Sequence, residues 1–148
     1  MADKNSETRS PKSPLEHQVG GDHYKSMDIQ PVEFALVNNL NTAQANIVKY
    51  LLRDKSADDI DKAIHYLDLW LEIAARYGYA LGQLAPPLYG RAGRGFPVIT
   101  VEYFSKCNKL SDKITQILSL VIDEPTSASL GAARYFMEEL PKVGPRSQ

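Results

Sequence analysis

The chain has 148 residues, which suits one domain and is too short for two well-packed ones. Hydrophobic residues make up 43% and charged residues 24%, so there is enough apolar material for a core and a wholly disordered chain is excluded. The 17 Lys and Arg against 18 Asp and Glu give a net charge of −1. The overall charge therefore gives no strong attraction to nucleic acid or acidic lipid, and any anion binding requires a local cluster.

Cys107 is the single cysteine, which excludes an intramolecular disulfide and a cysteine-based zinc site. The N-terminal residues contain no apolar signal core, and no apolar run approaches the length of a membrane span. From these absences we expect a cytoplasmic protein with no membrane partner.

The pattern of apolar residues predicts an all-α fold, a small bundle of about five helices. We expect a flexible tail over 1–18 and a single helical domain over 19–148. Within that domain we expect motif-bearing helices at 19–78, a Pro/Gly-rich loop or arm at 79–99, and C-terminal helices at 100–141. We identify no internal repeat and no convincing strand.

The predicted helices cover residues 31–40, 43–53, 57–77, 101–122 and a last stretch that ends near 140. Ser56 with Asp59 resembles a capping box, Thr100 can cap the next helix, and Gly78 suits a helix end. In the first helix an apolar stripe is expected to face the core, formed by Val32, Ala35, Leu36 and Leu40.

Two of these helices suggest a homo-oligomer. The helix at 57–77 has an unusually broad apolar arc, and the apolar residues at 101–122 recur at nearly heptad spacing. Because a domain this small has few elements to cover both surfaces, we expect copies of the chain to associate.

Two groups of polar residues could bind an anion or a base. His23 and Tyr24 follow two glycines, where the backbone can approach a ligand closely. A stripe at helical spacing holds cations, an amide and a phenol on one face, namely Asn46, Lys49, Tyr50 and Arg53. The alternatives are a turn with a partly buried aromatic ring and a solvated basic face.

A third group lies on the next helix, where Asp59, Lys62, Ala63 and Tyr66 share a face. Asp59 is expected to pair with Arg53 or Lys49 across the short turn between the helices. The alternative is helix capping by Asp59 beside a surface Lys62.

Another face of the same helix carries an acidic line that could bind a divalent metal, formed by Asp61, His65, Asp68 and Glu72. The solvated face of an amphipathic helix explains that line equally simply. The Gly90–Gly95 segment lacks the Lys-[Ser/Thr] end of a Walker A motif, and no strand precedes it.

The first three groups, taken in this order, resemble the tailed-phage nucleotide kinase family over residues 20–72. The pattern consists of His23-Tyr24, Ile29-Gln30-Pro31, an Asn-x-x-Lys-Tyr-x-x-Arg helix at 46–53 and an Asp-Ile-x-Lys-Ala-x-x-Tyr-Leu helix at 59–67. Gln30 stands where the family usually has an acid, Ala45 where it commonly has glycine, and His65 where it has an aromatic residue.

The resemblance implies phosphoryl transfer to deoxynucleoside monophosphates, dTMP and dGMP, without a P-loop. ATP or another nucleotide would be the donor, and the need for Mg²⁺ is left open. It implies catalytic roles for Lys49, Arg53 and Asp59, with Asp59 orienting Arg53. It implies substrate-binding roles, and no metal ligands, for His23, Tyr24, Asn46, Tyr50, Lys62 and Tyr66.

Two other functions remain open on the sequence. A nucleotide-binding module without turnover would sequester a nucleotide signal or modulate a host or phage protein through the same cationic face. An all-α, metal-dependent nucleoside triphosphate pyrophosphatase would instead use the acidic line from Asp61 to Glu72.

Overall fold

The computed structural model describes residues 13–16, 19, 24, 26–53, 55–79 and 98–142. Within these residues the chain forms a 3₁₀ turn, η1 (Pro14–Glu16), six α-helices and no strand. The all-α fold class is confirmed, with six helices in place of about five. Most of the predicted tail and of the predicted loop at 79–99 lie outside the described residues, as does His23.

The helices are α1 (Pro31–Val37), α2 (Thr42–Leu52), α3 (Asp59–Tyr77), α6 (Val101–Cys107), α7 (Asp112–Ile122) and α8 (Ser127–Glu138). The first three and the last begin and end within a few residues of the predicted positions. The helix predicted over 101–122 is wrong, because α6 and α7 are separate helices with a turn between them.

The turn between α6 and α7 is a Schellman motif that the apolar spacing concealed. Lys109 takes a left-handed φ of 55°, and the N–H of Leu110 reaches back to the carbonyl of Ser105 at 2.9 Å. Ser111, which falls inside the single helix predicted over 101–122, caps α7 by accepting from the N–H of Ile114 at 3.2 Å. Since lysine is an unusual residue for a left-handed helix end, its presence gave no stop signal.

The predicted caps at Thr100 and Gly78 are confirmed, whereas the capping box of Ser56 with Asp59 forms only in part, because α3 begins after Asp58, which makes no side-chain cap hydrogen bond. The side chain of Asp59 accepts from the N–H of Ser56 at 3.0 Å, and the Ser56 hydroxyl accepts from the N–H of Asp58 at 3.2 Å. Thr100 caps α6 through the N–H of Tyr103. Gly78 ends α3 with a left-handed φ of 69°, which is a conformation that suits glycine.

The two halves of the described structure repeat the same three helices in the same register. The helices α1, α2 and α3 form the first repeat, and α6, α7 and α8 form the second. Pro31 begins α1 and Val101 begins α6, an interval of 70 residues that also separates α2 from α7. The same interval relates buried residues of α3 to buried residues of α8, pairing Ile60, Ala63 and Leu67 with Leu130, Ala133 and Met137.

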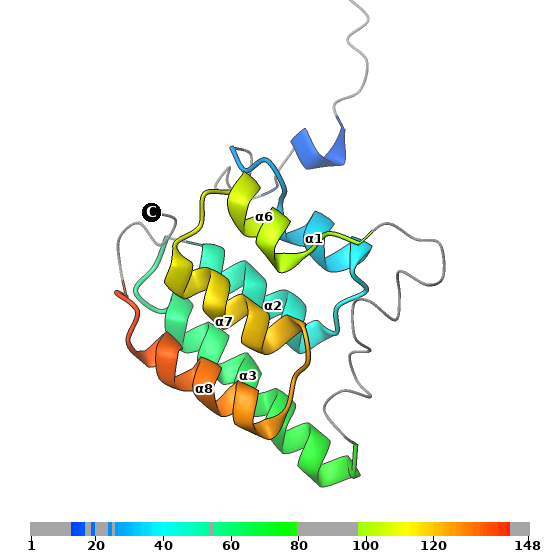
Figure 1. Cartoon of the computed structure of the whole chain (residues 1–148), viewed down its shortest axis with the longest axis vertical. Coiled ribbons are helices and arrows are strands. Elements are labelled where there is room, and N and C mark those ends of the chain that lie inside the picture. Colours follow the sequence, from blue (N-terminus) through cyan, green and yellow to red (C-terminus); the bar gives the residue numbers. More distant parts are fainter. Residues whose placement is uncertain are drawn as a thin grey trace, which may run out of the picture.

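Each helix of one repeat lies beside its own counterpart: α1 by α6, α2 by α7, and α3 by α8 (Figure 1). This is the reciprocal contact pattern of a two-fold symmetric dimer, built here within one chain. The structure therefore contains an internal repeat that inspection of the sequence did not reveal.

Two buried or half-buried asparagines hold the repeats together reciprocally. Asn38 donates from Nδ2 to the Ile99 carbonyl at 2.8 Å and accepts at Oδ1 from the Ile99 N–H at 3.2 Å. Asn108 makes the same pair of bonds to Ile29, at 2.7 and 3.1 Å. Beside these two pairs of hydrogen bonds, the rings of Phe34 and Phe104 stack with centroids 4.2 Å apart.

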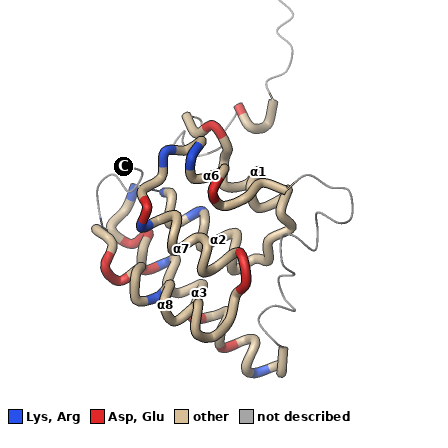
Figure 2. Tube along the Cα trace, viewed as in Figure 1, with Lys and Arg blue, Asp and Glu red and all other residues tan. Residues whose placement is uncertain are grey.

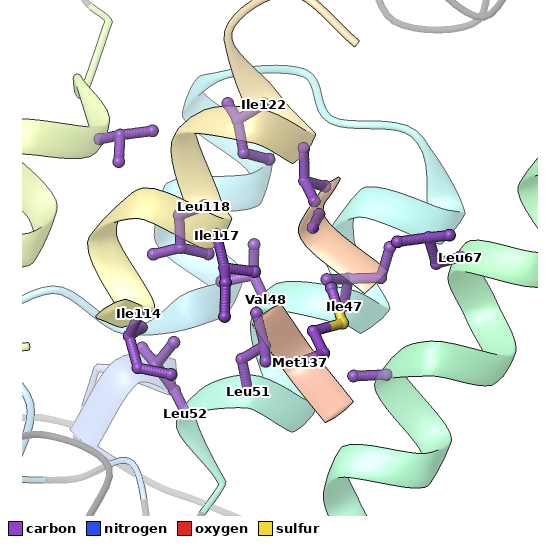
Figure 3. Packing of buried hydrophobic residues seen from close by; sticks show 14 of the residues in the cluster. Ile47, Val48, Leu51, Leu52, Leu67, Ile114, Ile117, Leu118, Ile122 and Met137 are labelled. Atoms are coloured by element: carbon purple, nitrogen blue, oxygen red, sulfur yellow. The ribbon is translucent and has the colours of Figure 1, made fainter. Parts of the chain in front are cut away.

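One hydrophobic cluster spans both repeats. Side chains from α2 and α7 interdigitate at its centre, and Leu67 of α3 and Met137 of α8 close it from the other side (Figure 3). Because α2 and α8 both pack on α3, most of the broad apolar arc of that helix is buried within the chain, while Ile73 and Tyr77 near its C-terminal end stay exposed. The homo-oligomer that this arc suggested stays a prediction.

The prediction of which face of α1 packs against the core is wrong. Phe34 and Asn38 are fully buried, whereas Val32 is 52% exposed and Leu36 is 77% exposed. The helix is rotated because Phe34 must reach Phe104. None of the described helices is long and apolar enough to cross a membrane.

We expect Asn38→Ala to lower the free energy of unfolding by about 2–4 kcal/mol, because the N–H and the carbonyl of Ile99 both lose their partner. Urea denaturation measures this change. The control is Gln116→Ala, an exposed amide on α7 whose removal should cost less than about 0.5 kcal/mol. Equal stability of the two variants would show that the asparagine does not hold the repeats together.

Candidate functional site

Residues from α2, from the start of α3 and from the segment before α1 meet on one side of the first repeat. We call this group the cation–tyrosine cluster and define it as Tyr24, Lys49, Tyr50, Arg53, Asp59, Lys62 and Tyr66. All seven were predicted as site residues. Of the other two, Asn46 lies one turn before Lys49 and Tyr50 on α2, and His23 is outside the described residues.

Two stacked tyrosines form the centre of the cluster. The rings of Tyr50 and Tyr66 lie nearly parallel, at 18°, with centroids 6.0 Å apart. The Nζ atoms of Lys49 and Lys62 lie 4.9 and 5.5 Å from the centroid of the Tyr50 ring. Both distances are within the range of cation–π attraction, so one ring holds an ammonium group from α2 and another from α3.

Arg53 and Asp59 face each other across the turn between α2 and α3, as the sequence predicted. Arg53 Nε lies 4.0 Å from Asp59 Oδ1, and the carboxylate is completely buried. The second oxygen, Oδ2, accepts from the N–H groups of Lys55 and Ser56 at 3.2 and 3.0 Å. Asp59 thus fixes the turn with one oxygen and turns the other toward the guanidinium.

The Arg53–Asp59 contact is too long for a hydrogen bond. Nε of Arg53 and Oδ1 of Asp59 are both buried atoms with no hydrogen-bond partner among the residues that the structure describes. Buried polar atoms left in this state cost free energy and are uncommon in folded proteins. At this turn the two atoms face each other as an ion pair of opposite charges, 4.0 Å apart.

Tyr24 joins the cluster from the segment that precedes α1. Its hydroxyl donates to the carbonyl of Lys49 at 3.3 Å. Burial raises the pKa of the Tyr24 phenol to about 12; the nearby Arg53 charge opposes this rise, and Asp59 and Tyr50 add to it.

The cluster carries an excess of positive charge. Lys49, Lys62 and Arg53 contribute three cations against the single carboxylate of Asp59. Among the described residues neither lysine forms an ion pair. His65 is exposed beside Tyr66, with the two rings edge to face. The arrangement can attract an anion and hold it against aromatic rings.

A cavity of about 390 Å³ opens between α1 and α2 and shares Tyr24 and Lys49 with the cluster. Asn46 also lines it, with Nδ2 donating to the carbonyl of Thr42 at 2.9 Å. Sequence reasoning missed this cavity because it needs the relative placement of two helices. The rotation of α1 that exposes Val32 and Leu36 was the missing information.

The acidic line on α3 is divided into separate ion pairs. Asp61 pairs with Lys142 at 2.6 Å, Asp68 with Arg134 at 3.0 Å, and Glu72 with Arg76 at 3.5 Å. Across the part of the chain that the structure describes, no three His, Cys, Asp or Glu side chains gather as a metal site would need. The geometry gives no support to the pyrophosphatase alternative.

The second repeat does not carry the cluster. At the matching positions it has a hydroxyl, an acid and apolar groups: Ser119, Leu120, Asp123, Ala132 and Phe136 in place of Lys49, Tyr50, Arg53, Lys62 and Tyr66. The matching backbone of the second repeat therefore forms without these cations and phenols.

Comparisons of the chain with protein-family models, with curated proteins and with solved structures found no match.

Tyrosine NMR with ¹³Cζ labelling should show one phenol that titrates near pH 12, and this signal should be missing in Tyr24→Phe. Since the folded pKa exceeds the ordinary value of 10.0, the contribution of Tyr24 to stability is lost as the pH rises from about 10 to 12. A Tyr24 signal that titrates near pH 10 would show that the phenol is not buried in the cluster.

Proposed function

We propose that the cation–tyrosine cluster binds the phosphate of a nucleotide, and that the protein is a nucleotide kinase without a P-loop. Its acceptors would be deoxynucleoside monophosphates such as dTMP and dGMP, with ATP or another nucleotide as donor, in the cytoplasm of a phage-infected host. The observation that carries the proposal is the pair of lysines on the Tyr50 ring beside Arg53, balanced by one buried carboxylate.

The charge of the cluster suits a phosphate group. Two ammonium groups lie against one ring, and a phosphate near them could accept charge-assisted hydrogen bonds from the lysines. A guanidinium can add a planar, bidentate pair of hydrogen bonds to phosphate oxygens. The Tyr50–Tyr66 stack places two aromatic rings beside the lysines, against which a base or sugar of the ligand could pack.

Phosphoryl transfer depends on positioning and on stabilising charge more than on covalent participation by the protein. In the proposed step an oxygen of the acceptor's phosphate attacks the terminal phosphorus of the donor. The bond from that phosphorus to its bridging oxygen breaks, and the donor leaves with the bridging oxygen's electron pair. Lys49, Lys62 and Arg53 would hold the negative charge that spreads over the transferred group, with Asp59 positioning Arg53.

The cluster does not fit a protein-held Mg²⁺. Asp59 is its one carboxylate, and this side chain is fully buried with Oδ2 bonded to two backbone N–H groups. Magnesium prefers several oxygen ligands and keeps part of its water shell. We therefore assign no step of the proposed reaction to a metal bound by these residues.

A nucleotide-binding module without turnover is the second candidate. The observation that favours it is the small size of the cluster, in which two lysines lie against the Tyr50 ring and one arginine faces Asp59. This suffices for one phosphate group, whereas a kinase must hold a donor and an acceptor side by side. Formation of product distinguishes the two functions.

We expect calorimetric titration with dTMP and dGMP to show binding that falls about tenfold or more in each of Lys49→Ala, Arg53→Ala and Lys62→Ala, because each variant removes one charged contact. The matched control is Lys113→Ala, which removes an exposed lysine of α7 that is not one of the cluster residues. Its affinity should equal that of the wild type.

Addition of ATP to the bound monophosphate, followed by chromatography, tests for the diphosphate product. Diphosphate that forms with the wild type and not with Lys49→Ala supports the kinase. Binding without product selects the module without turnover. Absence of any nucleotide binding would show that the cluster is structural and would overturn the proposal.

A further inference from the structure

The outer face of α1 differs in polarity from the matching face of α6 in the second repeat. Val32 and Leu36 of α1 are 52% and 77% exposed, and the matching residues of α6 are the charged Glu102 and Lys106. Figure 2 shows both charge signs on α6. Tyr103 of α6 is exposed as well, but the two helices occupy equivalent places in one chain and only α1 exposes aliphatic side chains, which the fold alone does not explain.

Beside these residues lies the cavity of about 390 Å³ between α1 and α2. Val32 and Leu36 form part of one wall, and Ala45 and Asn46 of α2 form part of the other. Ala45 matches the larger Thr115 of the second repeat. A small residue at this position leaves room where its counterpart would fill space.

The cavity has a polar end and an apolar end. Lys49 lies where the cavity meets the cation–tyrosine cluster. Among the described contacts, Asn46 uses one N–H of its side-chain amide, so the amide oxygen and the second N–H could bind a ligand. An apolar slot with a few fixed polar groups is the usual form of a small-molecule site, and 390 Å³ is at the small end of that class. The volume suits one base with its sugar.

We propose that the cavity between α1 and α2 binds the base of the nucleotide whose phosphate lies at Lys49. The inference rests on the proposed function and adds the place of the base and the residues that select it. Val32 and Leu36 would cover one face of the ring, and Asn46 would bond to its edge. The exposed apolar face of α1 would then be covered by the ligand.

Ala45→Leu fills the cavity without changing any charge, and Thr115→Leu is the matched control in the second repeat. Calorimetry with dTMP, dGMP and inorganic pyrophosphate separates base binding from phosphate binding. We expect Ala45→Leu to weaken both nucleotides about tenfold or more and to leave pyrophosphate within about twofold. Thr115→Leu should match the wild type for all three.

Nucleotide affinity that Ala45→Leu leaves unchanged, while Lys62→Ala still abolishes it, would overturn this inference and keep the proposed function. Absence of nucleotide binding in the wild type would overturn both. If Ala45→Leu does not fold, NOEs from the bound base to the methyl groups of Val32 and Leu36 decide the matter in the wild type. NOEs to other residues only would overturn the inference.

A second copy of the chain is the competing occupant of this face. Light scattering of the wild type and of Leu36→Gln distinguishes it, since Leu36 is exposed and its replacement should not disturb folding. A monomeric wild type with weaker nucleotide binding in Leu36→Gln supports the inference. A dimer that Leu36→Gln dissociates, with nucleotide affinity unchanged, would overturn it.

Discussion

The exchange of hydrogen bonds between Asn38 and Ile99, and between Asn108 and Ile29, holds the two repeats of this protein in register. Each asparagine ends a short helix and satisfies both backbone groups of a residue in the other repeat. A buried amide without a hydrogen-bond partner costs free energy. A shift of one repeat along the other would break the two hydrogen bonds of each asparagine. The Phe34–Phe104 stack and the shared core of α2 and α7 follow from that alignment.

A frame with two equivalent halves also shows which residues the fold does not need. Lys49, Arg53 and Lys62 have the uncharged or acidic counterparts Ser119, Asp123 and Ala132, and the second repeat folds without them. Under the proposed function, the cations and phenols of the first repeat serve to bind the nucleotide. The same comparison separates the apolar outer face of α1 from the charged face of α6. The second repeat acts as the partner that completes the core.

The sequence predicts the parts of this structure that depend on neighbours along the chain. Helical spacing brought Lys49, Tyr50 and Arg53 to one face, and the short turn placed Asp59 against Arg53. Prediction from the sequence failed where contacts between residues distant along the chain determine the structure. The left-handed Lys109 divides a continuous apolar pattern, and contact with Phe104 rotates α1 so that Val32 and Leu36 face outward. The repeat escaped notice because its halves share apolar positions and few identical residues, Phe34 and Asn38 among those that recur.

The central claim is that one half of a two-fold frame has a nucleotide site and the other half does not. Amide chemical shifts of ¹⁵N-labelled protein, recorded while dTMP is added, test it most directly. The account predicts shifts at Lys49, Tyr50 and Lys62 that saturate at one nucleotide per chain, with Ser119, Leu120 and Ala132 unmoved. Equal shifts at the matching residues of both repeats, or none at the cluster, would contradict it.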